Sequence, residues 1–276
     1  MPSEDILHLI QEKLLYVLVA FDRVCREHGL TYFLDSGTAL GAIRHGGFIP
    51  WDDDVDVGMP RKDYERFLII GQEFLPEDIF IQTTQTEPNY KRNAAKLRLK
   101  GTVFQEANDL PYKYNGFFID IFPFDNVPAN QILAKGYIFI SRFLFWIIRS
   151  WWSSNDSSSL VLRLTQRIIR LLPQKRIEIL NALYVKHCRL YENKETGYIT
   201  CFYWRMTQNK TYIFDTREMF PTTDILFERK LVRIMKSPDY YLSIMYGNYN
   251  ELPPEDKRQY HLKYKVDFGI NAEKKL

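Results

Sequence analysis

The sequence predicts an α/β fold in which helices flank a mixed β-sheet, with a helical insertion in the middle of the chain. Short apolar runs with alternating polar residues, such as residues 54–57, indicate strands. Amphipathic stripes with helical spacing separate these runs. The chain has 276 residues and is 46% hydrophobic, which is enough for one large core. We expect residues 1–130 and 195–276 to form the α/β domain and residues 131–194 to form the insertion.

The first predicted element is an amphipathic helix near the N-terminus. Ser3 is in position to cap its start and Gly29 to end it. No signal-peptide pattern is visible, and the three cysteines are far apart without metal-ligand spacing. We therefore expect free thiols and a cytoplasmic protein. The apolar stripe of this helix consists of Ile6, Ile10, Leu14, Val17, Phe21 and Val24.

A short strand, a small-residue turn and a helix are predicted next. The strand covers residues 32–34, and the helix starts near Thr38. A turn of Ser and Gly lets backbone N–H groups and the helix N-terminus approach a phosphate closely. Arg44 and His45 lie between this turn and the acidic segment that follows, where they could contact phosphate or the acceptor, with a surface-loop role as an alternative of at least equal weight. The predicted substrate-binding residues of this segment are Ser36, Gly37, Thr38, Arg44 and His45.

The most informative segment is residues 48–59, which read FIPWDDDVDVGM. On a strand, Asp54 and Asp56 share one face while the two valines face the other way. Two like charges side by side need a counter-ion, and Mg²⁺ or Mn²⁺ takes such oxygen ligands and holds a substrate phosphate as well. The segment therefore predicts metal-assisted chemistry on a phosphorylated substrate. The alternative is a solvated acidic turn.

A helix and two strands are predicted after this motif. The helix runs from Pro60 to about Phe74 and buries Tyr64, Phe67 and Leu68, and the strands cover residues 79–83 and 94–100.

Two cations and a third carboxylate follow on predicted strands. Lys96 and Arg98 share one strand face, where a cation could neutralise a donor phosphate. A solvated strand face is the equal alternative. Asp120 is the single charge in a long apolar run, and burying an unpaired carboxylate is costly. It is a candidate third metal ligand, or alternatively the partner of a core Lys or Arg.

This order of elements resembles the nucleotidyltransferase fold, in which a Gly-Ser/Thr turn holds nucleotide phosphates and a carboxylate pair holds the metal. The motifs resemble more closely the LicD family of phosphotransferases, a group that includes fukutin-related proteins. One departure is Asn248, where the pattern has an Asp. The segments that carry the resemblance are residues 35–45, 47–57, 119–123, 246–249 and 252–258 with His261.

The resemblance implies a transfer reaction. A phospho-alcohol, phosphocholine as the first choice, would move from a CDP-activated donor to a hydroxyl of a bacterial surface glycan, such as lipopolysaccharide or teichoic acid, and CMP would leave. Glycerol phosphate and ribitol phosphate stay open. Asp54 and Asp56 would hold the metal, and Asp120 would be the third ligand or the base. The resemblance places Lys96, Arg258 and His261 at the substrate.

The middle of the chain predicts an amphipathic helix at residues 132–152. Lys135, Arg142 and Arg149 are spaced by seven and line one face among many aromatic residues. A spanning helix would rarely carry three charges, whereas a helix lying in a membrane interface commonly does. Core helices with a cationic outer side, or an oligomer interface, are the alternatives.

The charge of this region supports contact with a membrane. Arg163, Arg167 and Arg170 again share a helical face. Residues 131–192 contain ten Lys/Arg and three Asp/Glu, a net charge of +7, which leaves −4 for the rest of a chain whose total is +3. We expect peripheral contact with anionic lipid at the inner face of the cytoplasmic membrane, where a lipid-linked acceptor glycan would give the contact a purpose.

The last third predicts strands near residues 198–202, 212–214 and 227–234, and a helix over residues 240–246 that Gly247 closes. A total charge of +3 is too small to indicate nucleic-acid binding. Two rival functions remain at this point. A nucleotide-sugar glycosyltransferase also uses an Asp-x-Asp motif, and a catalytically inactive membrane scaffold could be built on the insertion.

Overall fold

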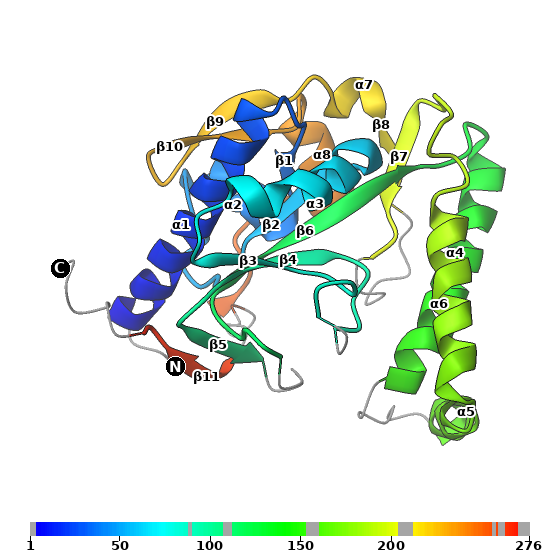
Figure 1. Cartoon of the computed structure of the whole chain (residues 1–276). Helices are drawn as coiled ribbons and strands as arrows, with labels where there is room; N and C mark the ends of the chain where they lie inside the picture. Colours follow the sequence, from blue (N-terminus) through cyan, green and yellow to red (C-terminus); the bar gives the residue numbers. More distant parts are fainter. Residues whose placement is uncertain are drawn as a thin grey trace. The chain divides into compact units, whose positions relative to one another are not determined.

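The structure of the protein, a computed structural model, describes residues 4–87, 90–106, 112–152, 160–203, 212–255, 258 and 263–269. The chain divides into two compact units. We call residues Met1–Pro123 with Thr216–Leu276 the sheet unit, and residues Phe124–Asp215 the helical unit. The chain contains both α-helices and β-strands, so the predicted α/β class is confirmed (Figure 1).

The sheet unit contains most of the strands and the N-terminal helices. Its elements are α1 (Glu4–Glu27), β1 (Phe33–Leu34), α2 (Ser36–His45), β2 (Asp56–Pro60), α3 (Arg61–Phe74), β3 (Ile79–Gln82), β4 (Ala95–Leu99), β5 (Val103–Glu106), the first part of β6 (Phe118–Asn126), α7 (Thr216–Met219), β9 (Thr223–Phe227), β10 (Lys230–Ile234), α8 (Pro238–Tyr246) and β11 (Lys263–Asp267).

The central sheet of this unit has the strand order β1-β2-β6-β4-β3. The registers of its antiparallel pairs place Gln82 of β3 opposite Lys96 of β4, and Lys96 opposite Asp120 of β6. On the other side of β6, the Asp120 N–H donates to the Val55 carbonyl at 2.9 Å. A row of polar residues therefore crosses the sheet beside the acidic motif. The β9–β10 hairpin and the β5–β11 pair form separate two-stranded sheets.

Helix α1 supplies much of the core of the sheet unit. The predicted stripe from Ile10 to Val24 is buried, as expected, whereas Ile6 at its start is 40% exposed. The helix ends at Glu27, and Gly29 follows with a φ of 62°, in the left-handed region that favours glycine. Ser3 lies outside the described residues. Cys25 in this helix is buried, and it, Cys188 and Cys201 are all free thiols.

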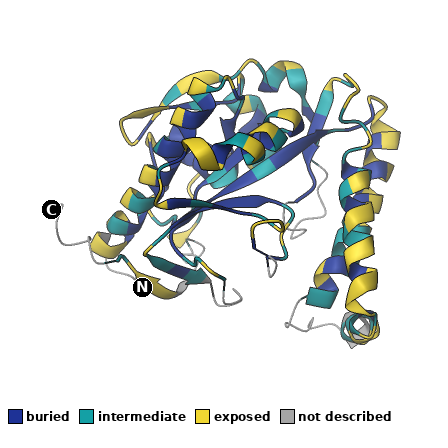
Figure 2. Ribbon diagram, viewed as in Figure 1, coloured by how far each residue is buried: buried dark blue, intermediate teal, exposed yellow. Residues whose placement is uncertain are grey.

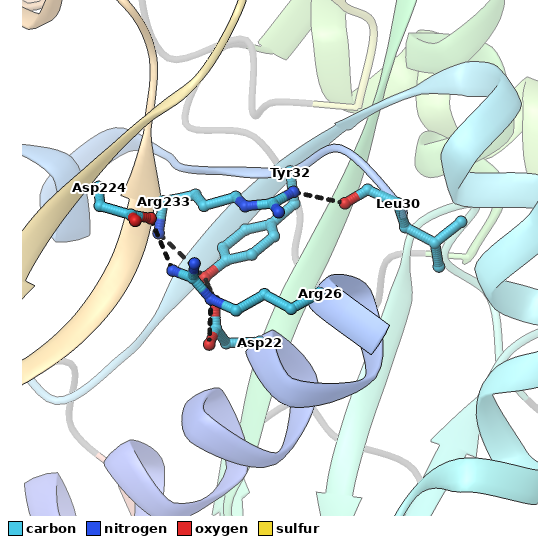
Figure 3. Close-up of polar contacts among 6 residues, drawn as sticks. All are labelled: Asp22, Arg26, Leu30, Tyr32, Asp224 and Arg233. Carbon is cyan, nitrogen blue, oxygen red and sulfur yellow. Dashed lines mark hydrogen bonds and ion pairs between the residues drawn. The ribbon is translucent and has the colours of Figure 1, made fainter. Parts of the chain in front are cut away.

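A polar cluster joins α1 to β1 and to the β9–β10 hairpin (Figure 3). The Tyr32 hydroxyl donates to Asp22 at 2.6 Å and accepts the Arg233 N–H at 3.0 Å. Arg26 donates to Asp22 at 2.8 Å and to Asp224 at 2.7 Å. Each hydrogen-bonding group in the cluster has a partner from another segment, so the cluster fixes the hairpin against the helix.

The helical unit contains the end of β6 and the elements α4 (Gln131–Trp152), α5 (Leu160–Arg170), α6 (Gln174–Cys188), β7 (Tyr198–Cys201) and β8 (Phe214–Asp215). Residues Phe124–Asn126 pair with β7, and β7 pairs with β8. Helix α4 packs against both α5 and α6. The Tyr137 hydroxyl of α4 donates to the His187 carbonyl of α6. Asn126 holds the loop after α6, donating to the Lys194 carbonyl at 2.9 Å.

Two local predictions were wrong. The segment 227–234, expected to be one strand, contains the end of β9, a tight turn and β10, because Glu228 and Arg229 adopt φ values of 49° and 62°. Strand β2 begins at Asp56, so Asp54 lies in the irregular segment before it. The argument from strand alternation therefore does not apply to Asp54.

Candidate active site

The site begins at the turn between β1 and α2. Asp35 caps α2, because its carboxylate accepts the Ser36 N–H at 2.8 Å. The Tyr241 hydroxyl of α8 donates to the same carboxylate. Asp35 is fully buried, and Ser36 has a φ of 47°, an uncommon conformation for a residue other than glycine. The turn is therefore fixed from both sides, and its helix N-terminus is held at one orientation.

Thr38 links this turn to the acidic motif. Its hydroxyl accepts the Asp56 N–H at 2.8 Å, while the Asp35 N–H donates to the Asp56 carbonyl at 2.9 Å. The hydroxyl of Thr38 thus has a structural partner. A Cβ added to Gly37 would lie 2.9 Å from the Asp52 Oδ2, so the Asp52 carboxylate lies close to the first turn of α2. Turn, helix start and acidic motif form one connected structure.

Negative charge is concentrated around Asp56. Burial raises the pKa of Asp56 well above its ordinary value, and the neighbouring carboxylates of Asp54, Asp120, Asp35 and Asp52 raise it further, in that order. The sequence placed three of these carboxylates together, and the structure adds Asp35 and Asp52. So many like charges in one place favour the binding of a cation.

Lys96 is a buried cation next to this cluster. Its Nζ lies 3.0 Å from Asp120 Oδ2, and only 1% of the Lys96 side chain is exposed. The Nζ also lies 3.2 Å from the centre of the Phe118 ring, a cation–π distance. Asp120 is therefore paired with a core Lys, the alternative that the sequence left open. The solvated strand face considered for Lys96 and Arg98 was wrong, because both are buried.

Arg98 forms a second buried layer beside Lys96. Its Nε donates to Gln82 Oε1 at 3.0 Å and its Nη1 to the Gly116 carbonyl at 3.1 Å. Its guanidinium carbon lies 4.4 Å from the centre of the Phe118 ring. Phe118 thus contacts both cations, and the Arg98 interactions fix the ring on which Lys96 rests.

The carboxylates suit a hard divalent cation. Asp54, Asp56 and Asp120 offer only oxygen donors, the ligands that Mg²⁺ and Mn²⁺ prefer. Their mutual repulsion at Asp56 is the physical observation that fits such an ion. Within the described part of the chain, no three His, Cys, Asp or Glu side chains stand together in the geometry of a metal site.

Trp51 forms the edge of the acidic motif. The His45 ring lies edge-on to Trp51 at 6.2 Å between centroids, and the Arg258 guanidinium lies 4.9 Å from the centre of the Trp51 ring. Burial and the nearby Arg44 charge both lower the pKa of His45. Two of the predicted substrate residues, His45 and Arg258, therefore meet at one aromatic ring. The predicted His261 lies outside the described residues.

Arg44 contacts His45, with its Nε 3.5 Å from His45 Nδ1, and its guanidinium is also held by two backbone carbonyls. Its Nη1 donates to the Tyr249 carbonyl at 2.8 Å and to the Glu251 carbonyl at 3.4 Å. Asn248 in the same turn donates to Glu251 at 2.6 Å. An Asp at position 248 would place a second negative charge against Glu251, which gives a local reason for the Asn in this chain.

Two glycines position the loop that carries the motif. A Cβ on Gly41 would lie 2.4 Å from the Gly47 carbonyl oxygen, so only glycine lets α2 approach the loop this closely. Gly46 ends α2 with a φ of 74°, in the left-handed region. Glu228 at the tip of the β9–β10 hairpin accepts the Phe48 N–H at 3.0 Å. The loop is thus held by both α2 and the hairpin.

Sequence reasoning missed two tyrosines of α8. Tyr241 holds Asp35, as described above. Burial raises the pKa of Tyr246, and the carboxylates of Asp35 and Asp56 raise it further. The segment that begins at Tyr246 carried part of the family resemblance, and that was the available signal.

The chain is similar in sequence to known proteins. Residues 29–151 match the family model described as LicD/FKTN/FKRP, nucleotidyltransferase domain. The lipopolysaccharide cholinephosphotransferase LicD of Haemophilus influenzae is 27% identical over 260 residues, covering 90% of this chain and 93% of that protein.

Two shorter matches cover single segments. The human ribitol 5-phosphate transferase FKRP is 54% identical over 35 residues, which are 13% of this chain and 7% of that protein. An uncharacterized protein of Rickettsia prowazekii, RP689, is 49% identical over 51 residues, 18% of each chain.

Proposed function

We propose that this chain, whose residues 29–151 match the LicD/FKTN/FKRP nucleotidyltransferase domain, is a LicD-type transferase that moves a phospho-alcohol from a CDP-activated donor to a glycan hydroxyl and releases CMP. Phosphocholine is the first choice, as the name of the Haemophilus influenzae relative suggests, and ribitol phosphate is the second, as the name of FKRP suggests. The acceptor is a bacterial surface glycan, either as its lipid-linked precursor or as the completed surface glycan. The carboxylate cluster around Asp56, next to the buried Lys96, is the observation that carries this proposal.

The donor diphosphate binds at the start of α2. Ser36, Gly37 and Thr38 form the first turn of this helix, and the positive end of the helix dipole favours the charge of the diphosphate. Thr38 acts through its hydroxyl hydrogen bond to the Asp56 N–H, so its part is to hold the acidic strand against the turn. Arg258 and His45 at Trp51 serve the outer part of the substrate. We keep Arg44 and His261 as substrate-binding candidates.

Transfer is an in-line displacement at the phosphorus that carries the alcohol. The glycan hydroxyl oxygen forms a bond to that phosphorus, the bridging P–O bond breaks, and the electron pair leaves with CMP. Asp120 would accept the hydroxyl proton or serve as a metal ligand. Lys96, held 3.0 Å from Asp120, stabilises negative charge on the transferring group.

Asp54, Asp56 and Asp120 would hold Mg²⁺ or Mn²⁺. When bound, such an ion supplies charge neutralisation at the diphosphate. The Asp35 cap and its Tyr241 hydrogen bond keep the turn rigid, and the buried position of Lys96 limits access of water.

We also propose a division of labour along the chain. Residues 1–130 with 195–276 form the catalytic domain, and residues 131–194 form an insertion that serves the acceptor. The enzyme works in the cytoplasm at the inner face of the membrane, where a nucleotide-activated donor meets a lipid-linked acceptor.

The test is CMP release from CDP-choline, CDP-ribitol and CDP-glycerol with Mg²⁺, in the presence of a lipid-linked glycan acceptor. We expect release with one donor, loss of release with EDTA, and a loss of about 10²- to 10⁴-fold in Asp56→Asn. Asp5→Asn on the exposed side of α1 is the matched control and should retain full activity.

UDP-glucose and UDP-galactose are included in the same assay. Release of UDP in place of CMP would replace the proposal with a glycosyltransferase. Full activity of Asp56→Asn would remove the acidic cluster from the chemistry. Absence of any nucleotide release, with vesicle binding intact, would favour an inactive scaffold.

A further inference from the structure

Helix α4 of the helical unit has an exposed apolar face. Ile132 is 80% exposed, Phe139 70% and Phe143 53%, and with Gly136 they recur at intervals of three and four residues. This spacing places them on one side of the helix. In Figure 2 the exposed residues of α4 and α6 are the yellow segments of these ribbons. An exposed apolar face of this length lowers the solubility of a protein unless a binding partner covers it.

The next two helices continue the same pattern. Leu164 and Ile168 on α5 and Leu171 just after it are exposed and lie at positions i, i+4 and i+7. Ile179 and Leu183 on α6 are exposed and four residues apart. All three helices of the unit therefore present apolar side chains to solvent. We call the exposed stripe of α4, which consists of Ile132, Phe139 and Phe143, the apolar face.

Positive charge accompanies the apolar face. On α4, Lys135, Arg142 and Arg149 form a line beside the exposed apolar stripe, because they are seven residues apart and offset from it. The segment 131–192 carries a net charge of +7, and the rest of the chain carries −4. This asymmetry identifies the chemistry of the partner, since an apolar face with a cationic border is complementary to the surface of an anionic bilayer.

The packing of α4 favours a helix in the plane of the membrane over one that spans it. By length and composition α4 could cross a bilayer, with 28% of its most apolar window buried. Its opposite side, however, packs against α6 through Tyr137 and His187. Helix α6 carries Lys175, Arg176 and Glu178, which would be costly to bring into hydrocarbon.

We propose that the apolar face of the helical unit docks on an anionic lipid bilayer, with α4 lying in the interface and its basic residues at head-group level. The purpose of this contact, access to a lipid-linked acceptor, rests on the proposed function. The contact itself does not, because its test measures binding and no catalysis. Either idea can therefore fail without the other.

The test is flotation of the full chain with vesicles of phosphatidylcholine, with and without phosphatidylglycerol. We expect binding that rises with the phosphatidylglycerol fraction and is released by high salt, as interfacial binding requires. Phe139→Ser/Phe143→Ser should weaken binding by about tenfold or more. Lys135→Glu/Arg167→Glu should weaken it by at least about twentyfold on vesicles with phosphatidylglycerol.

Matched controls come from the sheet unit. Ile69→Ser removes an apolar side chain of 81% exposure from α3, and Lys62→Glu/Lys230→Glu makes the same change in total charge at exposed positions. Both should bind vesicles like the parent. Thermal unfolding of every variant establishes that a loss of binding is not a loss of fold.

Three outcomes would overturn the proposal. In the first, Phe139→Ser/Phe143→Ser binds vesicles like the parent. In the second, the parent resists release by high salt and by alkaline carbonate, which would indicate a spanning helix. In the third, the parent is a dimer without lipid, the serine variant is a monomer, and neither binds vesicles. The apolar face would then be an interface between two copies of the chain.

Discussion

The two units of this protein depart from ordinary burial in opposite directions. The sheet unit buries charges, including Asp35, Lys96 and Arg98, which soluble proteins usually keep at the surface. The helical unit exposes Ile132 and Phe139, which soluble proteins usually bury. Both departures cost stability or solubility in the isolated chain. The comparison agrees with the two proposals above: the buried charges suit a phosphorylated substrate, and the exposed apolar side chains suit a lipid surface.

The largest expected effect tests the buried charges. Lys96→Met leaves Asp120 buried without its cation, which should lower the free energy of unfolding by about 3–5 kcal/mol. Replacing both partners, Lys96→Met/Asp120→Leu, should recover most of this loss because no lone charge remains. Urea unfolding of the parent and the two variants measures both effects.

The same variants separate structure from chemistry. If Asp120 acts on the substrate, the double variant is folded and inactive in the CMP release assay. A folded double variant with parental activity would mean that Asp120 serves only as the partner of Lys96. The buried charges of Lys96 and Asp120 would then have no role in catalysis.

The second prediction compares one glycine from each unit. Gly41→Ala forces a Cβ against the Gly47 carbonyl and should cost about 1–3 kcal/mol, because backbone must move. Gly136→Ala on α4 meets nothing within 4 Å and should stabilise the protein by about 0.5–1 kcal/mol, because alanine favours the helix. Thermal and urea unfolding give both values.

Measuring CMP release by the same two variants gives a second comparison between the units. Gly41→Ala displaces the loop before Asp52, so its CMP release should fall more than its stability predicts, while Gly136→Ala should keep parental release. Equal behaviour of the two variants would show that the close approach of α2 to the loop does not matter.

The third prediction concerns a charge at the surface of the sheet unit. The hydrogen bond from Arg26 lowers the pKa of Asp224 below its ordinary value of 3.8. A lowered carboxyl pKa stabilises the fold above the ordinary value, and this contribution is lost as the pH falls through the folded-state pKa. Because the Asp224 side chain is 49% exposed, Asp224→Asn should cost less than about 1 kcal/mol at pH 7.

Urea unfolding at pH 7 and at the lowest pH at which both proteins fold measures this change. The difference between parent and Asp224→Asn should shrink at the lower pH and in high salt. A difference that grows as the pH falls would contradict the assigned direction of the pKa shift.

The sequence alone predicts local features well and distant pairings poorly. The helix stripe from Ile10 to Val24 and the lone charge of Asp120 could be read from spacing and from burial cost. The Lys96–Asp120 pair depends on the register of β4 and β6, which spacing does not determine. The hydrogen bond from Tyr241 to Asp35 joins the N-terminal and C-terminal segments of the sheet unit, which are far apart in the sequence. The hairpin at Glu228 was missed because its turn lacks the glycine or asparagine that normally marks such a turn.

The smallest expected effect is the most demanding test of the comparison. Phe139→Ser/Phe143→Ser removes two large apolar side chains, a change that in a core would cost several kcal/mol. Because both are more than half exposed, the free energy of unfolding in the absence of lipid should change by less than about 0.5 kcal/mol.

The parent should gain stability when phosphatidylglycerol vesicles are added, since a partner that binds only the folded state raises the unfolding free energy, and the variant should not. A large loss of stability without lipid would mean that these rings pack inside the protein. The contrast between a unit that buries charge and a unit that exposes apolar surface would then no longer hold.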